Sequence, residues 1–452
     1  MFIKRFGIFF VLLALGWGLF FSESPKGNVW AQKGSKPTFQ IYETHSIETA
    51  LPDSSTWLEN RDFWILSVFL VLLLLSTYAA LYRRSRRLIV LLSILSIVIL
   101  GFWFHGCPCP IGSIQHIILG FFQANYFVSW TILILFLAPL FMTLFFGRTF
   151  CGSTCPIGAV QEMLALFPIK IPDWLEHLLG LFRYFFLGFA VLCVACGLSF
   201  IICRFDPIVC LFRGGTGLRN ILIYSGLLLL IGVFVGRPYC RFLCPFGALL
   251  SICGQLSFKH ITVSPGKCDQ CRLCENICPY NAILKPTAKP TIQERRSGPI
   301  QLGGFLLLMP ILILFFGYLG SFLAFPMAQF HPIVKRAELV YAEETGLVDQ
   351  YGAFDETLAH YRSGVENEVL YRNAANVLRR FQIASPLFGC WVGFVFAAKL
   401  ISFSVRRKRT EYQTDSGRCF SCGRCFWHCP NQKENRVFLD GQIDFGFSRK
   451  SK

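Results

Sequence analysis

Seven long apolar stretches constrain the fold of this chain more than any other feature. They cover residues 63–82, 88–104, 126–146, 181–202, 221–236, 302–324 and 386–403. Most are close to the ~20 residues that an α-helix needs to cross a bilayer. Only 15% of the 452 residues are charged, against about 25% in soluble domains. We therefore expect an all-α polytopic membrane protein with about seven transmembrane helices.

The N-terminus carries the pattern of a secretory signal. Lys4 and Arg5 precede the apolar run 6–21, and small residues allow cleavage after Ala31. An uncleaved anchor helix is the alternative. Residues 1–31 are thus expected to be a signal peptide or N-terminal anchor, followed by an extracytoplasmic segment over residues 32–62.

Short basic runs predict the orientation of the helices. Residues 83–87 follow the first apolar stretch with four arginines, and residues 406–409 follow the last with four basic residues. The positive-inside rule places both runs in the cytoplasm, which seven crossings from an outside start allow. The net charge of +17 lies in such runs, so it indicates a protein surrounded by membrane lipid rather than a nucleic-acid binder. We expect a multi-pass protein of the bacterial inner membrane.

This topology divides the chain into membrane and soluble parts. The expected order is a five-helix membrane domain over 63–258, a cytoplasmic segment over 259–296, a transmembrane helix over 302–324, an extracytoplasmic helical segment over 325–385, a transmembrane helix over 386–405 and a second cytoplasmic segment over 406–452. Within the extracytoplasmic segment, residues 366–382 have the pattern of a polar helix. One loop departs from the charge rule, because residues 203–220 are placed outside yet carry three arginines.

One cysteine pattern occurs twice in the five-helix domain. Residues 146–159 and 235–248 share Gly-Arg, then Cys-x-x-x-Cys-Pro, then Gly-Ala, at an offset of 89 residues. An outer cysteine pair precedes each copy, namely Cys107 with Cys109 and Cys203 with Cys210. Such an internal repeat indicates two copies packed about a pseudo-axis, with equivalent cysteine pairs facing each other.

Two further cysteine runs carry the strongest chemical signal. Each has the spacing Cys-x-x-Cys-x-x-Cys-x-x-x-Cys-Pro, and they contain Cys268, Cys271, Cys274 and Cys278, then Cys419, Cys422, Cys425 and Cys429. In bacterial ferredoxins, three thiolates of such a run bind one [4Fe–4S] cluster and the fourth binds the other. One predicted cluster therefore takes Cys268, Cys271, Cys274 and Cys429, and the second takes Cys419, Cys422, Cys425 and Cys278. The two runs would form a split 2[4Fe–4S] ferredoxin module of small α+β type, with a zinc site as the alternative.

The repeated motifs supply further thiols. The inner set, Cys151, Cys155, Cys240 and Cys244, suits an additional iron–sulfur cluster or redox dithiols, with a packed turn as the alternative. The outer set, Cys107, Cys109, Cys203 and Cys210, suits either disulfides or an anionic cluster whose charge Arg204 and Arg213 offset. We interpret Cys193, Cys196, Cys253 and Cys390 as packing residues, with a bridging redox role for the first two as the alternative.

Other cofactors and reactions have little support. All eight histidines lie in loops or near helix ends, and no Cys-x-x-Cys-His occurs, so no haem site is predicted. His105 and His116 flank the first outer pair, where quinone contact is the alternative to satisfied loop histidines. No phosphate-binding glycine loop or Ser-His-Asp pattern stands out, which disfavours nucleotide binding and hydrolysis.

On these paired motifs followed by ferredoxin runs, the chain from about residue 63 to residue 452 resembles the membrane polyferredoxins of the NosR, NapH and CcoG type. The resemblance implies electron transfer between the quinone pool or a cytoplasmic donor and a periplasmic reductase or its maturation. Residues 32–61 leave no room for a periplasmic flavin-binding domain, so no FMN domain is expected. The split ferredoxin runs and the outer cysteines also depart from the NosR pattern.

We therefore expect an electron-transfer component rather than a stand-alone enzyme. Its two [4Fe–4S] clusters would pass electrons through the inner cysteines towards a periplasmic respiratory oxidoreductase. The alternatives are an assembly factor that reduces a metal or thiol in a partner oxidoreductase, and a scaffold subunit that binds its partner through residues 325–385.

Overall fold

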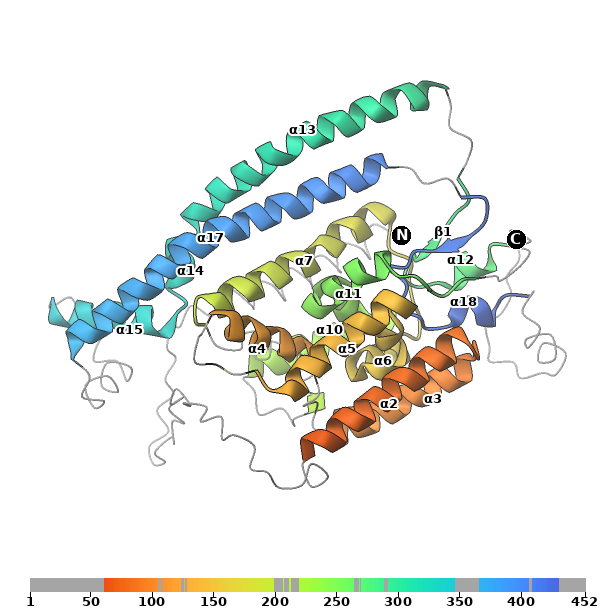
Figure 1. The fold of residues 1–452 in the computed structure, drawn as a ribbon, viewed down its shortest axis with the longest axis horizontal. Coiled ribbons are helices and arrows are strands. Elements are labelled where there is room, and N and C mark those ends of the chain that lie inside the picture. Colours follow the sequence, from red (N-terminus) through yellow and green to blue (C-terminus); the bar gives the residue numbers. More distant parts are fainter. Residues whose placement is uncertain are drawn as a thin grey trace.

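The computed structural model describes residues 61–104, 106, 109–122, 126, 128–198, 206, 211–212, 219–263, 268, 270–287, 292–345, 366–405 and 409–430. The predicted signal peptide, the three cysteines Cys107, Cys203 and Cys210, and the arginines Arg204 and Arg213 lie outside these residues. The molecule is elongated, and most of its helices run along the long axis (Figure 1). The small elements β1, α12 and α18 lie at one end, which we call the cysteine-rich end, and α15 lies at the opposite end.

Helices dominate the described chain. In order, those of the first part are α2 (Arg61–Leu81), α3 (Arg86–Ser96), the π-helix η1 (Ile97–Trp103), α4 (Pro110–Phe122), α5 (Trp130–Phe146), the π-helix η2 (Phe150–Thr154), α6 (Pro156–Leu164), α7 (Asp173–Ala195), α10 (Arg219–Phe234), the π-helix η3 (Tyr239–Leu243) and α11 (Pro245–Gln255). Those of the second part are α12 (Leu273–Ile277), α13 (Ile292–Phe322), α14 (Ala324–Ala328), α15 (Pro332–Glu344), α17 (Asn367–Ser404) and α18 (Arg424–Trp427). The two strands are β1 (Ile283–Leu284) and β2 (Gln413–Thr414).

Five of the described helices are long and apolar enough to cross a membrane. These are Asp62–Leu81, Arg86–Trp103, Asp173–Ala195, Ile300–Phe322 and Asn367–Ser404. Three shorter apolar helices accompany them, at Pro110–Phe122, Trp130–Phe146 and Leu222–Phe234. The expected spans over 126–146 and 221–236 correspond to the last two, which are shorter than the ~20 residues typical of a crossing helix.

Two expected helix boundaries are wrong. The stretch expected over 181–202 is α7, which begins at Asp173 and ends before Gly197, a residue with φ of +91°. Acidic side chains in the first turn of α7 favour the earlier start because they complement the helix dipole. The polar helix over 366–382 and the span over 386–403 are a single helix, α17, which continues through Pro386. Proline is tolerated in such helices when neighbouring groups satisfy the freed carbonyl.

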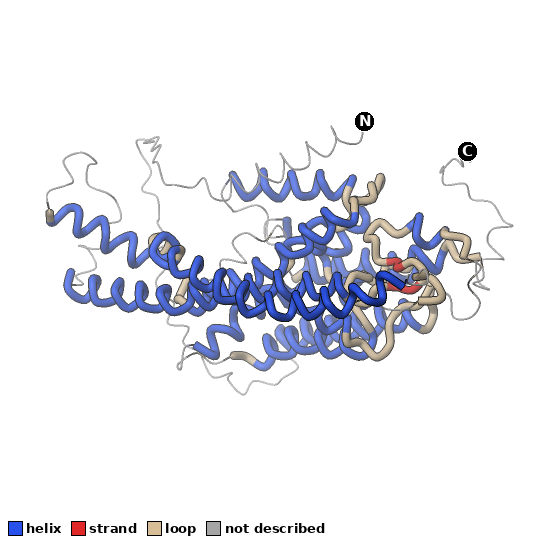
Figure 2. The backbone as a smooth tube through the Cα atoms, turned by 90° about the horizontal axis from the view of Figure 1, so that it is seen from above, coloured by secondary structure: helices blue, strands red, loops and turns tan. Residues whose placement is uncertain are grey.

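Helices α13 and α17 form a long antiparallel hairpin on one side of the bundle (Figures 1 and 2). Their backbones touch at Gly389, where an added Cβ would overlap the carbonyl oxygen of Phe316. Small residues allow this close approach between membrane helices. Only 6% of the most apolar window of α13 is buried, so the rest of this helix faces outward. Cys390 lies in this contact, beside Gly317, as expected of a packing residue.

A small apolar core closes the opposite end. Helices α14, α15 and the first half of α17 pack there against the end of α7, around residues such as Val334, Val340 and Phe381. Cys193 and Cys196 are buried in this core. Their environment is that of the packing residues predicted from the sequence.

The two ferredoxin halves meet at the cysteine-rich end, although α13 and α17 separate them in sequence. Strand β1 of the first half pairs with β2 of the second in an antiparallel ladder, with Ile283 opposite Thr414. The pair is visible as the two short red strands among the loops of Figure 2. Helices α12 and α18 are also in contact. The hairpin of α13 and α17 therefore leaves this end and returns the chain to it.

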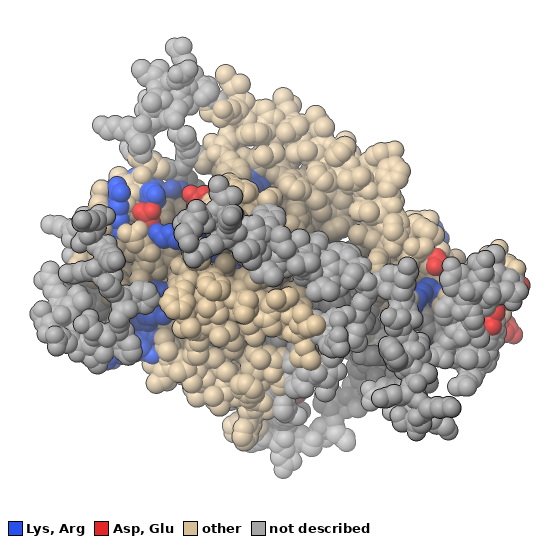
Figure 3. All heavy atoms as spheres, turned by 180° about the vertical axis from the view of Figure 1, so that it is seen from behind, with Lys and Arg blue, Asp and Glu red and all other residues tan. Residues whose placement is uncertain are grey.

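Charge is distributed in keeping with a membrane protein. On the face drawn in Figure 3, charged side chains gather towards the two ends, and uncharged residues form the broad surface between them. Basic residues predominate at the cysteine-rich end of that view.

Candidate metal centre

The two motif segments, residues 147–159 and 236–248, fold alike. In each, a short π-helix that contains the first cysteine ends at the second cysteine, and an α-helix begins at the following proline. Cys155 and Cys244 are the N-cap residues of α6 and α11, with extended backbone angles, and the next proline suits the first helical position. The Cys244 Sγ atom accepts a hydrogen bond from the Gly247 amide at 3.2 Å. Such π-helical turns are frequent at functional sites.

A third helix starts in the same way. Helix α4 begins at Pro110, directly after Cys109. One cavity is lined by the cysteines of all three Cys-Pro steps and by the two π-helical cysteines, that is, by Cys109, Cys151, Cys155, Cys240 and Cys244. Four of these cysteines are the complete inner set predicted from the sequence.

The position of Cys109 corrects one expectation. The repeat pattern assigned it to an outer site across the membrane from the inner cysteines, yet it lines the same cavity as they do. The reason is that the chain turns back into the bundle after η1, and the 13-residue helix α4 starts from inside it. Its predicted outer partners, Cys107, Cys203 and Cys210, lie outside the described residues.

The inner cysteines suit a soft metal group. Cys151, Cys240 and Cys244 are more than 90% buried. None of the cysteines that the structure describes is in a disulfide. Buried thiols from two segments around one cavity are the donors that an iron–sulfur cluster requires. In the described ranges, no three histidine, cysteine or carboxylate side chains converge as a single metal ion would need.

The ferredoxin cysteines assemble across the two halves. Burial, together with the nearby Cys268, Cys271 and Cys429 thiols, raises the pKa of the Cys274 thiol to about 11. Three neighbours of Cys274 are therefore the other members of the first predicted set, including the one from the second half.

The second predicted set is assembled in the same manner. Burial, together with the nearby Cys422 and Cys278 thiols, raises the pKa of the Cys419 thiol to about 12. Cys425 has Cys419, Cys422 and Cys278 as neighbours, and burial is again the main cause of its raised pKa. The structure thus brings Cys278 of the first run to the three leading cysteines of the second. A bound metal favours the deprotonated thiolate, so it would lower these raised pKa values.

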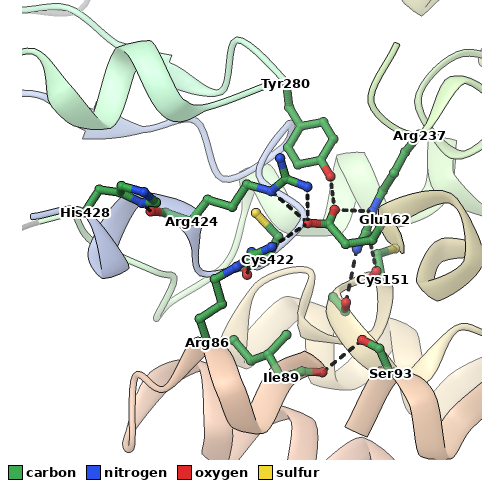
Figure 4. A network of polar contacts seen from close by, with 11 residues as sticks. Arg86, Ile89, Ser93, Cys151, Glu162, Arg237, Tyr280, Cys422, Arg424 and His428 are labelled. Carbon is green, nitrogen blue, oxygen red and sulfur yellow. Dashed lines mark hydrogen bonds and ion pairs between the residues drawn. The ribbon is translucent and has the colours of Figure 1, made fainter. Parts of the chain in front are cut away.

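A buried carboxylate joins the membrane bundle to both ferredoxin halves (Figure 4). Glu162 of α6 forms ion pairs with Arg86 at 3.4 Å, Arg237 at 3.2 Å and Arg424 at 2.9 Å, and it accepts a hydrogen bond from the Tyr280 hydroxyl. Arg86 begins α3, Arg424 belongs to the second half and Tyr280 to the first. Four separate parts of the chain therefore meet at one side chain.

The arginines determine the charge state of Glu162. Burial alone would raise the pKa of this carboxyl group, but Arg237, Arg424 and Arg86 outweigh it and lower the pKa to about 2. Glu162 is consequently ionised at neutral pH. We call Glu162 with its three arginines and Tyr280 the Glu162 cluster.

Each motif segment also carries a buried arginine that reaches into the other segment. Arg148 approaches Gly247, and Arg237 approaches Gly158, each with a guanidinium nitrogen 3.5 Å from where a Cβ would stand. Both guanidinium groups also lie over the ring of Phe420, at 4.4 Å and 5.4 Å from its centroid. The exchange of arginines fixes the two segments face to face around the cavity.

Comparisons with known proteins identify this arrangement. A family described as "4Fe-4S binding domain" matches residues 128–172 and 217–262, and a second family with that description matches residues 260–283. The first two matches contain the two motif segments, and the third contains the first ferredoxin half. The chain is therefore a membrane protein with 4Fe-4S binding domains.

Relatives of this membrane 4Fe-4S protein cover parts of the chain. Protein NirI of Paracoccus denitrificans is 27% identical over 280 residues, which is 55% of this chain and 40% of that protein. An uncharacterized protein of Methanocaldococcus jannaschii is 40% identical over 63 residues, or 14% of this chain and 25% of that protein. A second one from the same organism is 30% identical over 112 residues, or 25% and 41%. The chain thus spans between a quarter and about two fifths of these relatives. No solved structure gives a significant match.

Sequence reasoning missed the Glu162 cluster and the paired arginines Arg148 and Arg237. Glu162 is three residues beyond the end of the repeated pattern, and position 251 in the second copy is Ser, so the repeat gave no signal for it. The repeated Gly-Arg dipeptide was the available signal for Arg148 and Arg237. Of the histidines considered for quinone contact, His116 is hydrogen-bonded to Tyr126, and His105 is not described.

Proposed function

We propose that this protein is an electron conduit of the bacterial inner membrane. It would carry electrons between a cytoplasmic or quinone donor and a periplasmic respiratory oxidoreductase, with the ferredoxin module on the cytoplasmic side. The 4Fe-4S families and the similarity to NirI support an iron–sulfur electron-transfer role. The basic runs next to the first and last spans support the orientation.

Within the proposal, three sets of cysteines hold clusters. Two are the crossed ferredoxin sets, Cys268, Cys271, Cys274 and Cys429, then Cys419, Cys422, Cys425 and Cys278. The third is the inner set, Cys151, Cys155, Cys240 and Cys244. Bound [4Fe–4S] clusters would supply one-electron carriers at these positions. The protein residues supply thiol ligands, burial and close spacing.

The observation that carries the proposal is the contact between the inner set and the second ferredoxin loop. Gly152 follows Cys151, and a Cβ on it would lie 3.1 Å from the carbonyl oxygens of both Phe420 and Ser421. Those two residues lie between Cys419 and Cys422 in the chain. The backbone next to Cys151 therefore packs directly on the loop between Cys419 and Cys422. Such close packing supports electron transfer between carriers held by the two cysteine sets.

Counting iron and acid-labile sulfide on anaerobically purified protein tests the proposal. Three clusters require about 12 iron atoms per chain, four for each cluster. The variants Cys155→Ser and Cys244→Ser should each lower this to about 8 and remove the same EPR signal. Cys253→Ser is the matched control, since Cys253 lies on α11 outside the cavity lining. About 8 iron atoms in the unmodified protein, unchanged in both inner variants, would overturn the third cluster.

Transfer itself needs a second measurement. In sealed vesicles with the protein in one orientation, a reductant added on the ferredoxin side should reduce an impermeant acceptor on the other side. The Cys244→Ser variant should stop this while the ferredoxin signals remain. Equal rates with and without Cys244 would contradict the conduit.

A further inference from the structure

Arg148 is a buried cation without a carboxylate partner. Its side chain is 1% exposed and lines the cavity formed by the inner cysteines. Nη1 donates to the Gly417 carbonyl oxygen at 2.9 Å, Nη2 lies 3.8 Å from Cys151 Sγ, and Nε has no hydrogen-bond partner. Among the described residues it forms no ion pair.

Arg237, the counterpart of Arg148 in the other motif segment, has a carboxylate partner. Arg237 is equally buried, but it forms an ion pair with Glu162 and donates to the carbonyl oxygens of Cys151 and Gly152. The positive charge of Arg237 is thus compensated by the protein itself. Among the described residues that line the cavity, Arg148 is the one cation, and no carboxylate compensates its charge.

An isolated buried charge is strongly unfavourable, so Arg148 requires a negative group nearby. Three helices of at least nine residues, α4, α6 and α11, also begin at the cavity, with Pro110, Pro156 and Gly247 in its lining. The positive ends of their dipoles favour an anion at the same place. Two independent features therefore indicate that the cavity is built for negative charge.

We infer that Arg148 is the charge partner of an anionic iron–sulfur cluster held by Cys151, Cys155, Cys240 and Cys244. This inference rests on the proposed third cluster. Four thiolates give such a cluster a net negative charge, which grows by one unit on reduction. A fixed cation at its edge stabilises the reduced state more than the oxidised state and raises the reduction potential. Arg148 is a positioning residue for that charge and not a ligand.

Redox titration followed by EPR tests this role. The signal of the inner cluster is first assigned as the one that Cys244→Ser removes. In Arg148→Gln its reduction equilibrium constant should fall at least tenfold, which is about 59 mV for one electron. Arg148→Lys should restore most of the loss, because it keeps the charge. Arg183→Gln is the control, since Arg183 is a nearby arginine of α7 that bonds Ser251 and does not line the cavity.

The outcomes separate the inference from the proposal beneath it. No third cluster in the unmodified protein would overturn both. A third cluster with the same potential in Arg148→Gln would overturn the role of Arg148 and leave the conduit intact. A shift confined to the signal of the neighbouring ferredoxin cluster would also overturn it. If Arg148→Gln loses the inner cluster, Arg148→Lys decides between the two readings. A cluster retained in Arg148→Lys supports the charge role of Arg148, and a cluster lost in both variants contradicts it.

Discussion

The two motif segments have nearly the same local structure but different neighbours. The first, residues 147–159, contacts the second ferredoxin half: Gly152 packs on the backbone of Phe420 and Ser421, and Arg148 donates to Gly417. In the second, residues 236–248, the position of Gly152 is taken by Arg241. This arginine donates to the Pro279 carbonyl oxygen of the first half.

This difference in contacts explains how a split ferredoxin can be assembled. The first motif segment packs on the second half, and the second segment packs on the first half and also places Arg237 over Phe420 of the second. The halves complete each other through the β1–β2 ladder and the shared cysteines. The two-helix insertion between them is tolerated because both halves have a fixed place on the bundle. Gly236 shows the tightness of this fit, since a Cβ there would lie 2.9 Å from the Tyr280 ring.

The largest effect should follow from removing a crossed cysteine. Cys429→Ala removes the fourth predicted ligand of the cluster that Cys268, Cys271 and Cys274 bind. That cluster should be lost, and the iron content should fall by about four atoms per chain. The cluster of Cys419, Cys422 and Cys425 should remain, as judged by EPR. Cys390→Ala in the α13–α17 contact is the control and should keep all iron. If only the cluster of Cys419, Cys422 and Cys425 were lost, each half would bind its own cluster without a ligand from the other half.

The next largest effect should follow from Glu162→Gln. Three arginines would lose their shared carboxylate, and breaking a buried ion pair on one side costs about 3–5 kcal/mol. Thermal unfolding in detergent should show this loss. Glu368→Gln is the control, because its pair with Arg372 is 80% and 73% exposed and should contribute less than about 1 kcal/mol. Equal effects of the two variants would mean that the Glu162 cluster does not hold the halves in place.

The same carboxylate predicts a dependence on pH. The folded pKa of Glu162, about 2, is below the ordinary value of 4.5, so its contribution is complete above pH 4.5 and is lost as pH falls towards 2. The stability gap between the unmodified protein and Glu162→Gln should therefore be constant from pH 7 to 5 and shrink below 4.5. A gap that shrinks near pH 6 would point to a different group.

A smaller effect is expected where the first motif segment touches the second half. Gly152→Ala places a Cβ against two backbone carbonyls that cannot turn away, so overpacking should cost about 1–3 kcal/mol. Gly180→Ala on α7 has nothing within 4 Å of the new Cβ and should be neutral or slightly stabilising. Thermal unfolding compares them, and a neutral Gly152→Ala would mean that the second half is loosely attached.

Sequence predicted the chemistry of this molecule better than its packing. The ferredoxin spacing and the repeated Cys-Pro steps are local patterns, so their spacing alone indicated which cysteines belong together. The position of Cys109 could not be predicted in this way, because it depends on the chain turning back after η1. Hydropathy located the apolar stretches, but it divided α17 at Pro386 because it does not register the neighbours that keep a proline-containing helix continuous.

The Glu162 cluster could not be predicted for a related reason. Its members come from α3, α6, the start of the second motif segment and both ferredoxin halves. Glu162, Arg86 and Arg424 look like ordinary surface charges in their own stretches of sequence, and the repeat that singles out Arg237 does not indicate its partners. Only the three-dimensional contact reveals that they balance one another.

The smallest expected effect compares the two segments at equivalent glycines. A Cβ at Gly158 would lie 3.1 Å from the Cys151 carbonyl oxygen, and one at Gly247 would lie 3.1 Å from that of Cys240. Each would also meet the arginine of the other segment at 3.5 Å. The steric cost of Gly158→Ala and Gly247→Ala against the backbone should therefore be similar, and the arginines are neighbours that are held differently in the two segments.

The arginines make the sign of any difference between the two costs predictable. Arg237 is held by Glu162 and two carbonyl oxygens, whereas Arg148 has one carbonyl partner and an unpaired Nε. Arg148 can move to accommodate a new methyl group, and Arg237 cannot. Overpacking should lower the free energy of unfolding by about 1–3 kcal/mol. When both variants are unfolded in the same detergent, Gly158→Ala should show the larger loss and Gly247→Ala the smaller. The reverse order would mean that Arg148 is held as firmly as Arg237, and that the two segments are more alike than their described contacts indicate.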